Sequence, residues 1–124
     1  MTKTVLVVDD DSFILAALQT VLSSKGLKVI SLTNPQEAFI VAKKKRPDLI
    51  ISDVNMPGMD GFTLLSLLKS NAETKGIPVI MLTAANKVGD VEKGFALGSE
   101  TYLTKPITDW DRTWSKINLV LKVK

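Results

Sequence analysis

The middle of the chain reads Pro47-Asp48-Leu49-Ile50-Ile51-Ser52-Asp53 and continues Val54-Asn55-Met56-Pro57-Gly58-Met59-Asp60-Gly61. The first part is typical of a short buried strand, and the proline and glycines of the second exclude a helix there. Asp53 therefore stands where a strand ends. Open α/β sheets bind ligands at the carboxyl ends of their parallel strands, so Asp53 is a candidate functional residue.

The whole chain alternates between strand-like and helix-like patterns. We expect strands at Thr4–Val8, Lys28–Leu32, Leu49–Ser52, Pro78–Leu82 and Glu100–Thr104. We expect helices at about Ser12–Lys25, from Asn34-Pro35 to Arg46, and at about Phe62–Asn71, Lys87–Leu97 and Asp109–Lys122. This alternation predicts a doubly wound α/β fold, in which helices cover both faces of a parallel sheet. The more mixed second and fifth strands are expected at its edges.

Composition narrows the possible functions. The chain has 124 residues, of which 45% are hydrophobic, and we expect one domain spanning residues 1–124 with no room for an output domain. It contains neither cysteine nor histidine, which excludes thiol catalysis, disulfides, Ser-His-Asp triads and the usual zinc sites. No apolar run is long enough to span a membrane and nothing points to export, so a cytoplasmic protein is expected.

The net charge of +3 is too small to imply binding to nucleic acid. The basic run Lys43-Lys44-Lys45-Arg46 closes a predicted helix, where cations complement the helix dipole. Contact with a phosphate backbone is the less favoured interpretation of this run.

Acidic residues also follow the first strand, as Asp9, Asp10 and Asp11. A helix N-cap explains one of them, and Asp11 or Ser12 suits that role. If the first and third strands are neighbours, Asp9 and Asp10 converge on Asp53. Such a cluster needs a hard cation, and oxygen ligands suit Mg²⁺. Asp53 is then a candidate nucleophile toward phosphorus, and the main-chain carbonyl of Asn55 is a further candidate ligand.

Two more polar residues follow the fourth and fifth strands. Thr83 can hydrogen-bond a phosphoryl oxygen, although a threonine also suits a strand without such a role. Lys105 can donate to a phosphoryl group or pair with a carboxylate, and an exposed lysine is the alternative. The Lys105-Pro106 bond is a candidate for cis geometry.

Over its whole length, the chain resembles the receiver domain of bacterial response regulators. The matching segments are Val5-Leu6-Val7-Val8-Asp9-Asp10, Ser52 to Gly61, Pro78 to Ala84 and Gly98 to Pro106. The resemblance implies a flavodoxin-like (βα)5 fold with strand order 2-1-3-4-5, and this strand order is taken from the family rather than from the residues.

The resemblance also implies roles for individual residues. Asp53 would be the phosphoacceptor, Asp10 a direct Mg²⁺ ligand, and Asp9 a largely water-mediated one. Asn55 would offer its main-chain carbonyl, and Thr83 and Lys105 would contact the phosphoryl group. Tyr102 matches an aromatic switch position, which is compatible with half-buried packing on an edge strand. Asn55 and Ala85 would set the lifetime of the phosphorylated state.

The chain departs from the family's pattern after Pro106. Ile107 replaces the usual phenylalanine, Trp110 and Trp114 replace aliphatic residues, and Arg112 stands where an apolar residue is common. We expect Trp114 in the core with Ile117 and Leu121 and leave Trp110 open between core and partner contact.

Three functions compete at this stage. In the first, a sensor histidine kinase or phosphotransfer protein phosphorylates Asp53, and a change in the fourth helix, fifth strand and fifth helix presents a face to a protein target. Gly89 and Gly94 weaken that fourth helix, as a switch requires, although ordinary tolerance of glycine is an equal interpretation. The second is a small Mg²⁺-dependent phosphatase, disfavoured because Asn55 stands where a general acid is needed. The third is an unphosphorylated interaction scaffold.

Overall fold

The structure is a computed structural model that describes residues 2–84 and 87–122. Its strands are β1 (Thr4–Val8), β2 (Lys28–Leu32), β3 (Leu49–Asp53), β4 (Val79–Ala84) and β5 (Thr101–Lys105). Its helices are α1 (Ser12–Ser24), α2 (Pro35–Lys45), α3 (Gly61–Ser70), α4 (Val88–Ala96) and α5 (Trp110–Leu121). Every predicted element is present, and no end differs from the prediction by more than two residues.

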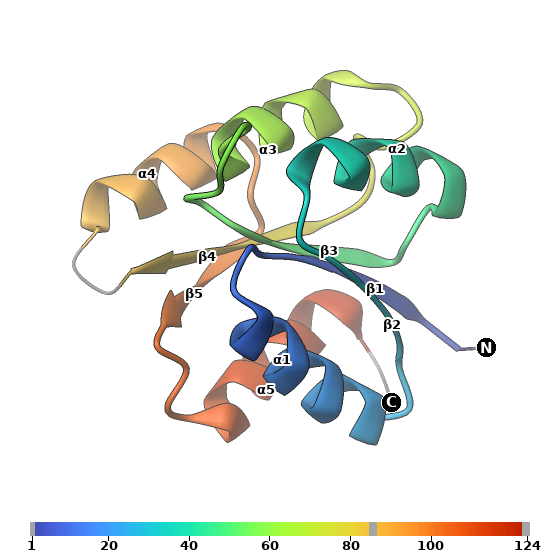
Figure 1. The fold of residues 1–124 in the computed structure, drawn as a ribbon, viewed down its shortest axis with the longest axis vertical. Coiled ribbons are helices and arrows are strands. Elements are labelled where there is room, and N and C mark those ends of the chain that lie inside the picture. Colours follow the sequence, from blue (N-terminus) through green and yellow to red (C-terminus); the bar gives the residue numbers. More distant parts are fainter. Residues whose placement is uncertain (1, 85–86, 123–124) are drawn as a thin grey trace.

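The strands form one parallel sheet in the order β2-β1-β3-β4-β5. Figure 1 shows α1 and α5 on one face of this sheet and α2, α3 and α4 on the other. The doubly wound flavodoxin-like fold and its strand order are therefore confirmed, with β2 and β5 at the edges. No helix in the described ranges is long and apolar enough to cross a bilayer.

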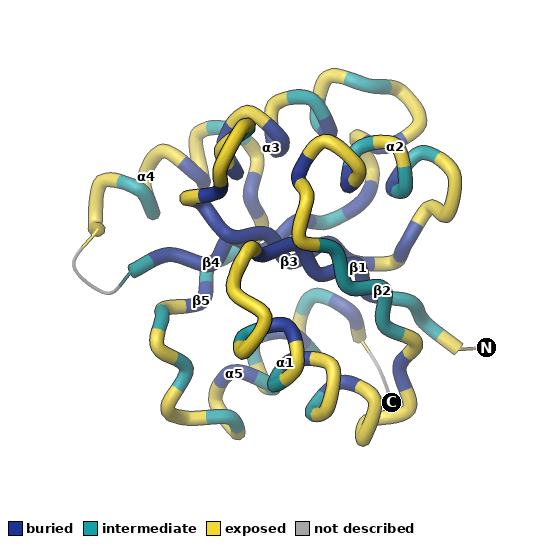
Figure 2. Tube along the Cα trace, in the orientation of Figure 1, coloured by how far each residue is buried: buried dark blue, intermediate teal, exposed yellow. Residues whose placement is uncertain are grey.

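The sheet separates two hydrophobic cores. Val5 and Val7 of β1 pack with α1 and α5, whereas Leu6 and Val8 pack with α2 and α3. All four are fully buried, because successive side chains of a strand point to opposite faces. Figure 2 shows the central strands of the sheet in the dark blue of buried residues, whereas the edge strand β2 is mostly teal.

Three strands extend further at their carboxyl ends than predicted, and β5 does so by one residue, Lys105. β3 continues through Asp53, which pairs with Leu82, and β4 continues through Thr83 and Ala84, which pair with Thr104 and Lys105 of β5. Asp53, Thr83 and Lys105 are thus strand residues, held by the sheet rather than by loops. A side chain on a sheet is placed more firmly than one on a loop.

The helices differ in how they begin. Side chains of Asp11, Asn34, Asp60 and Asp109 accept backbone N–H groups at the starts of α1, α2, α3 and α5. α4 has no side-chain cap at Lys87, and it contains Gly89 and Gly94. A side-chain cap contributes about 1 kcal/mol to a helix, so α4 has the weakest start of the five described helices.

The buried faces of α1 and α5 refine the predictions. In α1 the buried residues are Leu15, Leu18 and Leu22, whereas Ile14 and Val21 are only half-buried. In α5 the buried stripe is Thr113, Ile117 and Leu121, and Arg112 is exposed.

Trp110 and Trp114 are half-buried and pack against the core beneath α1 and α5. Lys25, the C-cap of α1, reaches the ring of Trp114, with Nζ 5.3 Å from the centroid.

The basic run lies where the sequence predicted it. Lys43, Lys44 and Lys45 form the last turn of α2, and Arg46 is its C-cap in the left-handed conformation. Arg46 also pairs with Glu73, at 3.7 Å between Nη2 and Oε2.

Candidate functional site

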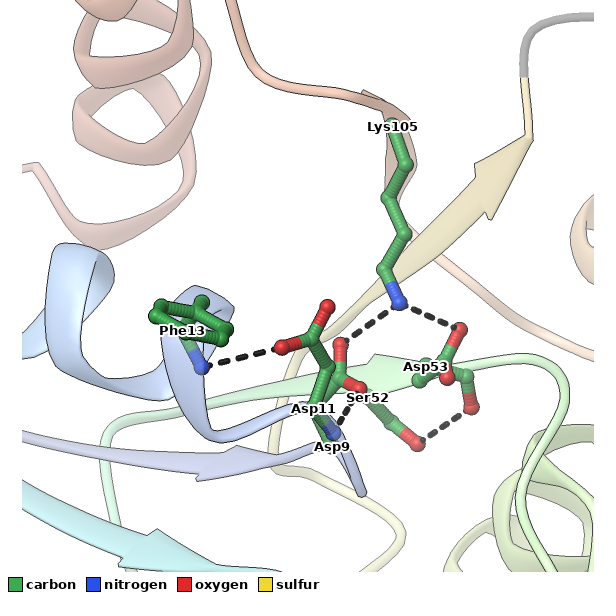
Figure 3. A network of polar contacts seen from close by, with 6 residues as sticks. All are labelled: Asp9, Asp11, Phe13, Ser52, Asp53 and Lys105. Atoms are coloured by element: carbon green, nitrogen blue, oxygen red, sulfur yellow. Dashed lines mark hydrogen bonds and ion pairs between the residues drawn. The ribbon is translucent and has the colours of Figure 1, made fainter.

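Four neighbouring strands deliver the polar residues predicted from the sequence to one edge of the sheet. Asp9 directly follows β1, Asp53 ends β3, Thr83 lies near the end of β4, and Lys105 ends β5. Because β1, β3, β4 and β5 are adjacent and parallel, their carboxyl ends share this edge. Figure 3 shows Asp9 and Asp53 with the side chain of Lys105 reaching down between them.

Lys105 bridges the two buried carboxylates. Its Nζ lies 2.8 Å from Asp9 Oδ2 and 3.2 Å from Asp53 Oδ1. Burial lowers the pKa of Lys105, but the hydrogen bond to Asp9 and the charges of Asp53 and Asp9 outweigh it, so the pKa lies above its ordinary value. Lys105 is therefore a fixed positive charge at this edge, and the alternative of an exposed lysine is wrong.

The three acids after β1 divide their roles. Asp9 is fully buried, and its Oδ1 accepts the backbone N–H of Asp11 at 2.9 Å. Asp11 accepts the N–H of Phe13 at 2.9 Å and is the N-cap of α1, so Asp11 rather than Ser12 takes the capping role. Asp10 is exposed. Asp9 and Asp10 thus remain available to the site.

Asp9, Asp10 and Asp53 form a compact acidic group. Each offers one carboxylate oxygen such that the three oxygens lie within 4.8 Å of one another. Three carboxylates so close repel each other, and a single lysine does not balance three negative charges. A hard divalent cation with oxygen ligands fits this group.

Burial and charge perturb the titration of Asp53. Asp53 is only 5% exposed to solvent. Burial and the charge of Asp9 raise the pKa of the Asp53 carboxyl to about 6, although Lys105 and a hydrogen bond from the Asn55 backbone oppose the rise. Strongly perturbed carboxyl groups concentrate at functional sites.

Thr83 brings an unpaired hydroxyl to the same edge. The residue is 2% exposed, and its Oγ1 finds no hydrogen-bond partner among the described residues. Leaving a buried hydroxyl unpaired costs about 1–3 kcal/mol. This cost favours a role for Thr83 in binding a ligand over mere β propensity.

The other predicted residues lie around this centre. Asn55 is exposed in the loop after β3. Tyr102 is half-buried on β5 and meets Phe95 of α4 edge-on, with ring centroids 6.2 Å apart. The Lys105-Pro106 bond is cis, as the sequence suggested. Ala85 lies outside the described residues.

Sequence reasoning missed two residues that contact Asp53. Ser52 donates its hydroxyl to the Asp53 carbonyl at 3.0 Å, and Gly61 lies against the same carbonyl. Nothing in the sequence distinguishes Ser52 from the other residues of its strand. The only signal for Gly61 was a glycine at the first position of a helix, where glycine is not preferred.

Comparison with known proteins agrees with this geometry. Residues 5–115 match the family model of the response regulator receiver domain. This chain is a response regulator receiver domain. The receiver domain is 38% identical to the response regulator PleD of Caulobacter vibrioides over 109 residues. The aligned segment covers 88% of this chain and 24% of PleD.

Solved receiver structures share the fold. The chemotaxis response regulator CheY4 of Vibrio cholerae superimposes with a TM-score of 0.90 at 32% identity, covering 98% of this receiver domain and 100% of CheY4. The CheX–CheY–BeF3–Mg²⁺ complex from Borrelia burgdorferi gives a TM-score of 0.88 at 31% identity, covering 98% of this chain and 90% of that one.

Membership in this family establishes a regulatory domain of two-component systems, consistent with switching by phosphorylation. Receiver domains take phosphoryl groups from histidine kinases, interact with other proteins, and generally bind Mg²⁺ at an acidic pocket. This receiver domain spans less than half the length of the curated relatives described, 24% of PleD and 43% of the transcriptional regulatory protein PrrA of Mycobacterium tuberculosis.

Proposed function

We propose that this receiver domain is a switch that accepts a phosphoryl group on Asp53 from a sensor histidine kinase or a phosphotransfer protein. One observation carries the proposal. A buried carboxylate, a bridging lysine and an unpaired buried hydroxyl meet at one sheet edge beside two further carboxylates. Nothing in ordinary packing requires this combination, because each group is costly to bury alone.

The chemistry is a displacement at phosphorus. An Oδ atom of ionised Asp53 attacks the phosphorus of a phosphohistidine, a P–O bond forms, and the P–N bond to the donor imidazole breaks. The imidazole nitrogen leaves with the electron pair of that bond and takes up a proton. The Asp53 carboxyl has a pKa of about 6, so most of it is ionised at neutral pH.

Lys105 and Thr83 supply positive charge and a hydrogen-bond donor to the incoming group. Lys105 Nζ already lies 3.2 Å from Asp53 Oδ1, so a phosphoryl group on Asp53 meets this ammonium group. The unpaired hydroxyl of Thr83 gains a phosphoryl oxygen as partner. Both groups favour the phosphorylated state.

The acidic group fits Mg²⁺. The carboxylates of Asp9, Asp10 and Asp53 would hold the cation, together with the main-chain carbonyl of Asn55. Once bound, Mg²⁺ neutralises charge on the phosphoryl oxygens and on the acidic cluster. The CheY of the Borrelia complex, which contains Mg²⁺ and BeF3, supports this assignment by its likeness in sequence and fold.

The output surface in this proposal is the α4–β5–α5 face. Tyr102 and Phe95 place aromatic rings there, and Val88 of α4 is 67% exposed. Phosphorylation draws Thr83 inward and engages Lys105, which already lies beside Asp53, and this change biases α4, the helix without a side-chain cap. A protein target then binds this face in one state of the switch.

Incubation with Mg²⁺ and radiolabelled acetyl phosphate tests the proposal. A stable label on the wild type that is absent from Asp53→Asn supports the switch, since the amide is nearly isosteric but does not attack phosphorus. Rapid multiple turnover would instead indicate a phosphatase, and no label on the wild type an unphosphorylated scaffold.

A further inference from the structure

The main-chain carbonyl of Asp53 is enclosed from two sides. On one side, the Ser52 hydroxyl donates to it at 3.0 Å, and Ser52 is only 1% exposed. On the other side lies Gly61, the first residue of α3. A Cβ atom on Gly61 would overlap the Asp53 carbonyl oxygen and lie 2.9 Å from its carbonyl carbon. The obstacle is backbone, which moves only if the strand moves.

Gly61 is needed for space rather than for conformational freedom. The glycines with positive φ are Gly26, Gly58 and Gly98, and Gly61 is not among them. An alanine would therefore find no backbone strain at this position, only the carbonyl of Asp53. Met81 Cε also lies 2.9 Å from the added atom, but a methionine side chain can turn aside.

Backbone hydrogen bonds at Gly61 and Val54 connect the start of α3 to the end of β3 and to β4. The Gly61 N–H donates to the Val54 carbonyl at 2.7 Å, and the Val54 N–H donates to the Leu82 carbonyl of β4 at 3.1 Å. The peptide groups around Asp53 are thus fixed by β4, by α3 and by the Ser52 hydroxyl. An aspartate has a short side chain, so the position of its backbone decides where its carboxylate lies relative to Lys105.

We propose that Ser52 and Gly61 are positioning residues that clamp the Asp53 carbonyl and thereby hold the acceptor carboxylate in its place beside Asp9 and Lys105. This inference rests on the proposed function, in which Asp53 receives the phosphoryl group. Displacing a reacting group by about 1 Å costs on the order of 10²-fold in rate. Neither residue touches the phosphoryl group in this proposal.

The test compares Gly61→Ala with Gly76→Ala in the 124-residue chain. Gly76 also lacks a positive φ, and a Cβ there would meet nothing within 4 Å, so it is a matched control. Two quantities are measured on folded protein below its melting transition. One is the initial rate of labelling of Asp53 by acetyl phosphate with Mg²⁺, and the other is the NMR chemical shift of the Asp53 carbonyl carbon without any donor.

We expect Gly61→Ala to shift the Asp53 carbonyl resonance and slow labelling by roughly 10²-fold, while Gly76→Ala changes neither. Adding Met81→Ala to Gly61→Ala should not restore labelling, because the overlap with the carbonyl remains. Full restoration by Met81→Ala would overturn the proposal, since Met81 would then be the obstacle. So would a wild-type resonance and labelling rate in Gly61→Ala.

Ser52→Ala decides the matter if Gly61→Ala does not fold. Losing one hydrogen bond should slow labelling by about 2- to 10-fold and move the Asp53 carbonyl resonance. The control is Ser66→Ala, at an exposed position of α3. Identical behaviour of Ser52→Ala and Ser66→Ala would overturn the clamp.

The two proposals fail in different ways. If Asp53→Asn is labelled as fast as the wild type, the phosphoacceptor assignment fails, and the donor-free resonance still reports on the clamp. If the wild type is labelled on Asp53 but both clamp variants match their controls, only the clamp fails.

Discussion

The ammonium group of Lys116 lies over the ring of Tyr102, with Nζ 4.0 Å from the ring centroid. The same Nζ donates to the Tyr102 main-chain carbonyl at 2.8 Å. Burial and the charge of Arg112 lower the pKa of Lys116. α5 thus holds both the ring and the backbone of the predicted switch residue.

Lys116→Met should release Tyr102 while keeping most of the apolar stem. The lost hydrogen bond and cation–π contact predict a decrease in the free energy of unfolding of about 1–2 kcal/mol. Urea denaturation measures it, and Lys44→Met at an exposed position of α2 should cost less than about 0.5 kcal/mol. Equal stability of the two variants would show that Lys116 does not hold Tyr102.

The raised pKa of Asp53 predicts a pH dependence of stability. The pKa of this carboxyl rises from 3.8 to about 6 on folding, chiefly through burial. Between these values the folded state binds more protons than the unfolded state, so the contribution of Asp53 to stability falls as pH rises through this window. The two pKa values correspond to at most about 3 kcal/mol at neutral pH.

Asp53→Asn removes this effect and separates it from the titration of other carboxyl groups. In EDTA the variant should be more stable than the wild type above about pH 6, and the difference should vanish below about pH 4. Thermal melts across this range provide the measurement. A wild type that is the more stable protein at pH 7.5 would contradict the prediction, and saturating Mg²⁺ should shrink the difference.

Asp10→Ala tests the acidic group as a Mg²⁺ site. Asp10 is exposed, so its loss should leave the metal-free fold intact or stabilise it by relieving repulsion from Asp9 and Asp53. The rise in Tm caused by Mg²⁺ should shrink.

Asp11→Ala is the matched control for Asp10→Ala. It removes the N-cap of α1 and should lower stability by about 1 kcal/mol while keeping the response to Mg²⁺. Equal Mg²⁺-induced shifts in wild type and Asp10→Ala would place the cation elsewhere.

Gly89→Ala should strengthen α4. A Cβ at Gly89 meets nothing within 4 Å, so alanine stabilises the helix by about 0.5–1 kcal/mol without a steric cost. Hydrogen exchange of the α4 amides should slow. If the softness of α4 serves the switch, the variant should also reduce the phosphorylation-induced change at Tyr102. Gly94→Ala is the comparison, because its Cβ would contact Met81 Cγ at 3.6 Å in the core.

Much of the architecture followed from local patterns. Continuous apolar runs around Val7, Ile50 and Ile80 indicated central strands, and their regular alternation with helices left a doubly wound sheet as the consistent fold. The strand order came from family resemblance, and the structure confirmed it. The strand ends were less accurate, because pairing with a neighbour extends β3 and β4 beyond their apolar runs.

The sequence by itself determined which residues reach the functional edge. Parallel strands end at one edge of a sheet, so Asp9, Asp53, Thr83 and Lys105 had to meet there once the strands were placed. Only the tertiary structure decided what each group contacts: Asp9 pairs with Lys105, and Gly61 lies against the Asp53 carbonyl. These contacts join residues from different elements or depend on the path of a loop. Their distances are therefore set by the packing of the sheet and its helices, which no local pattern of residues encodes.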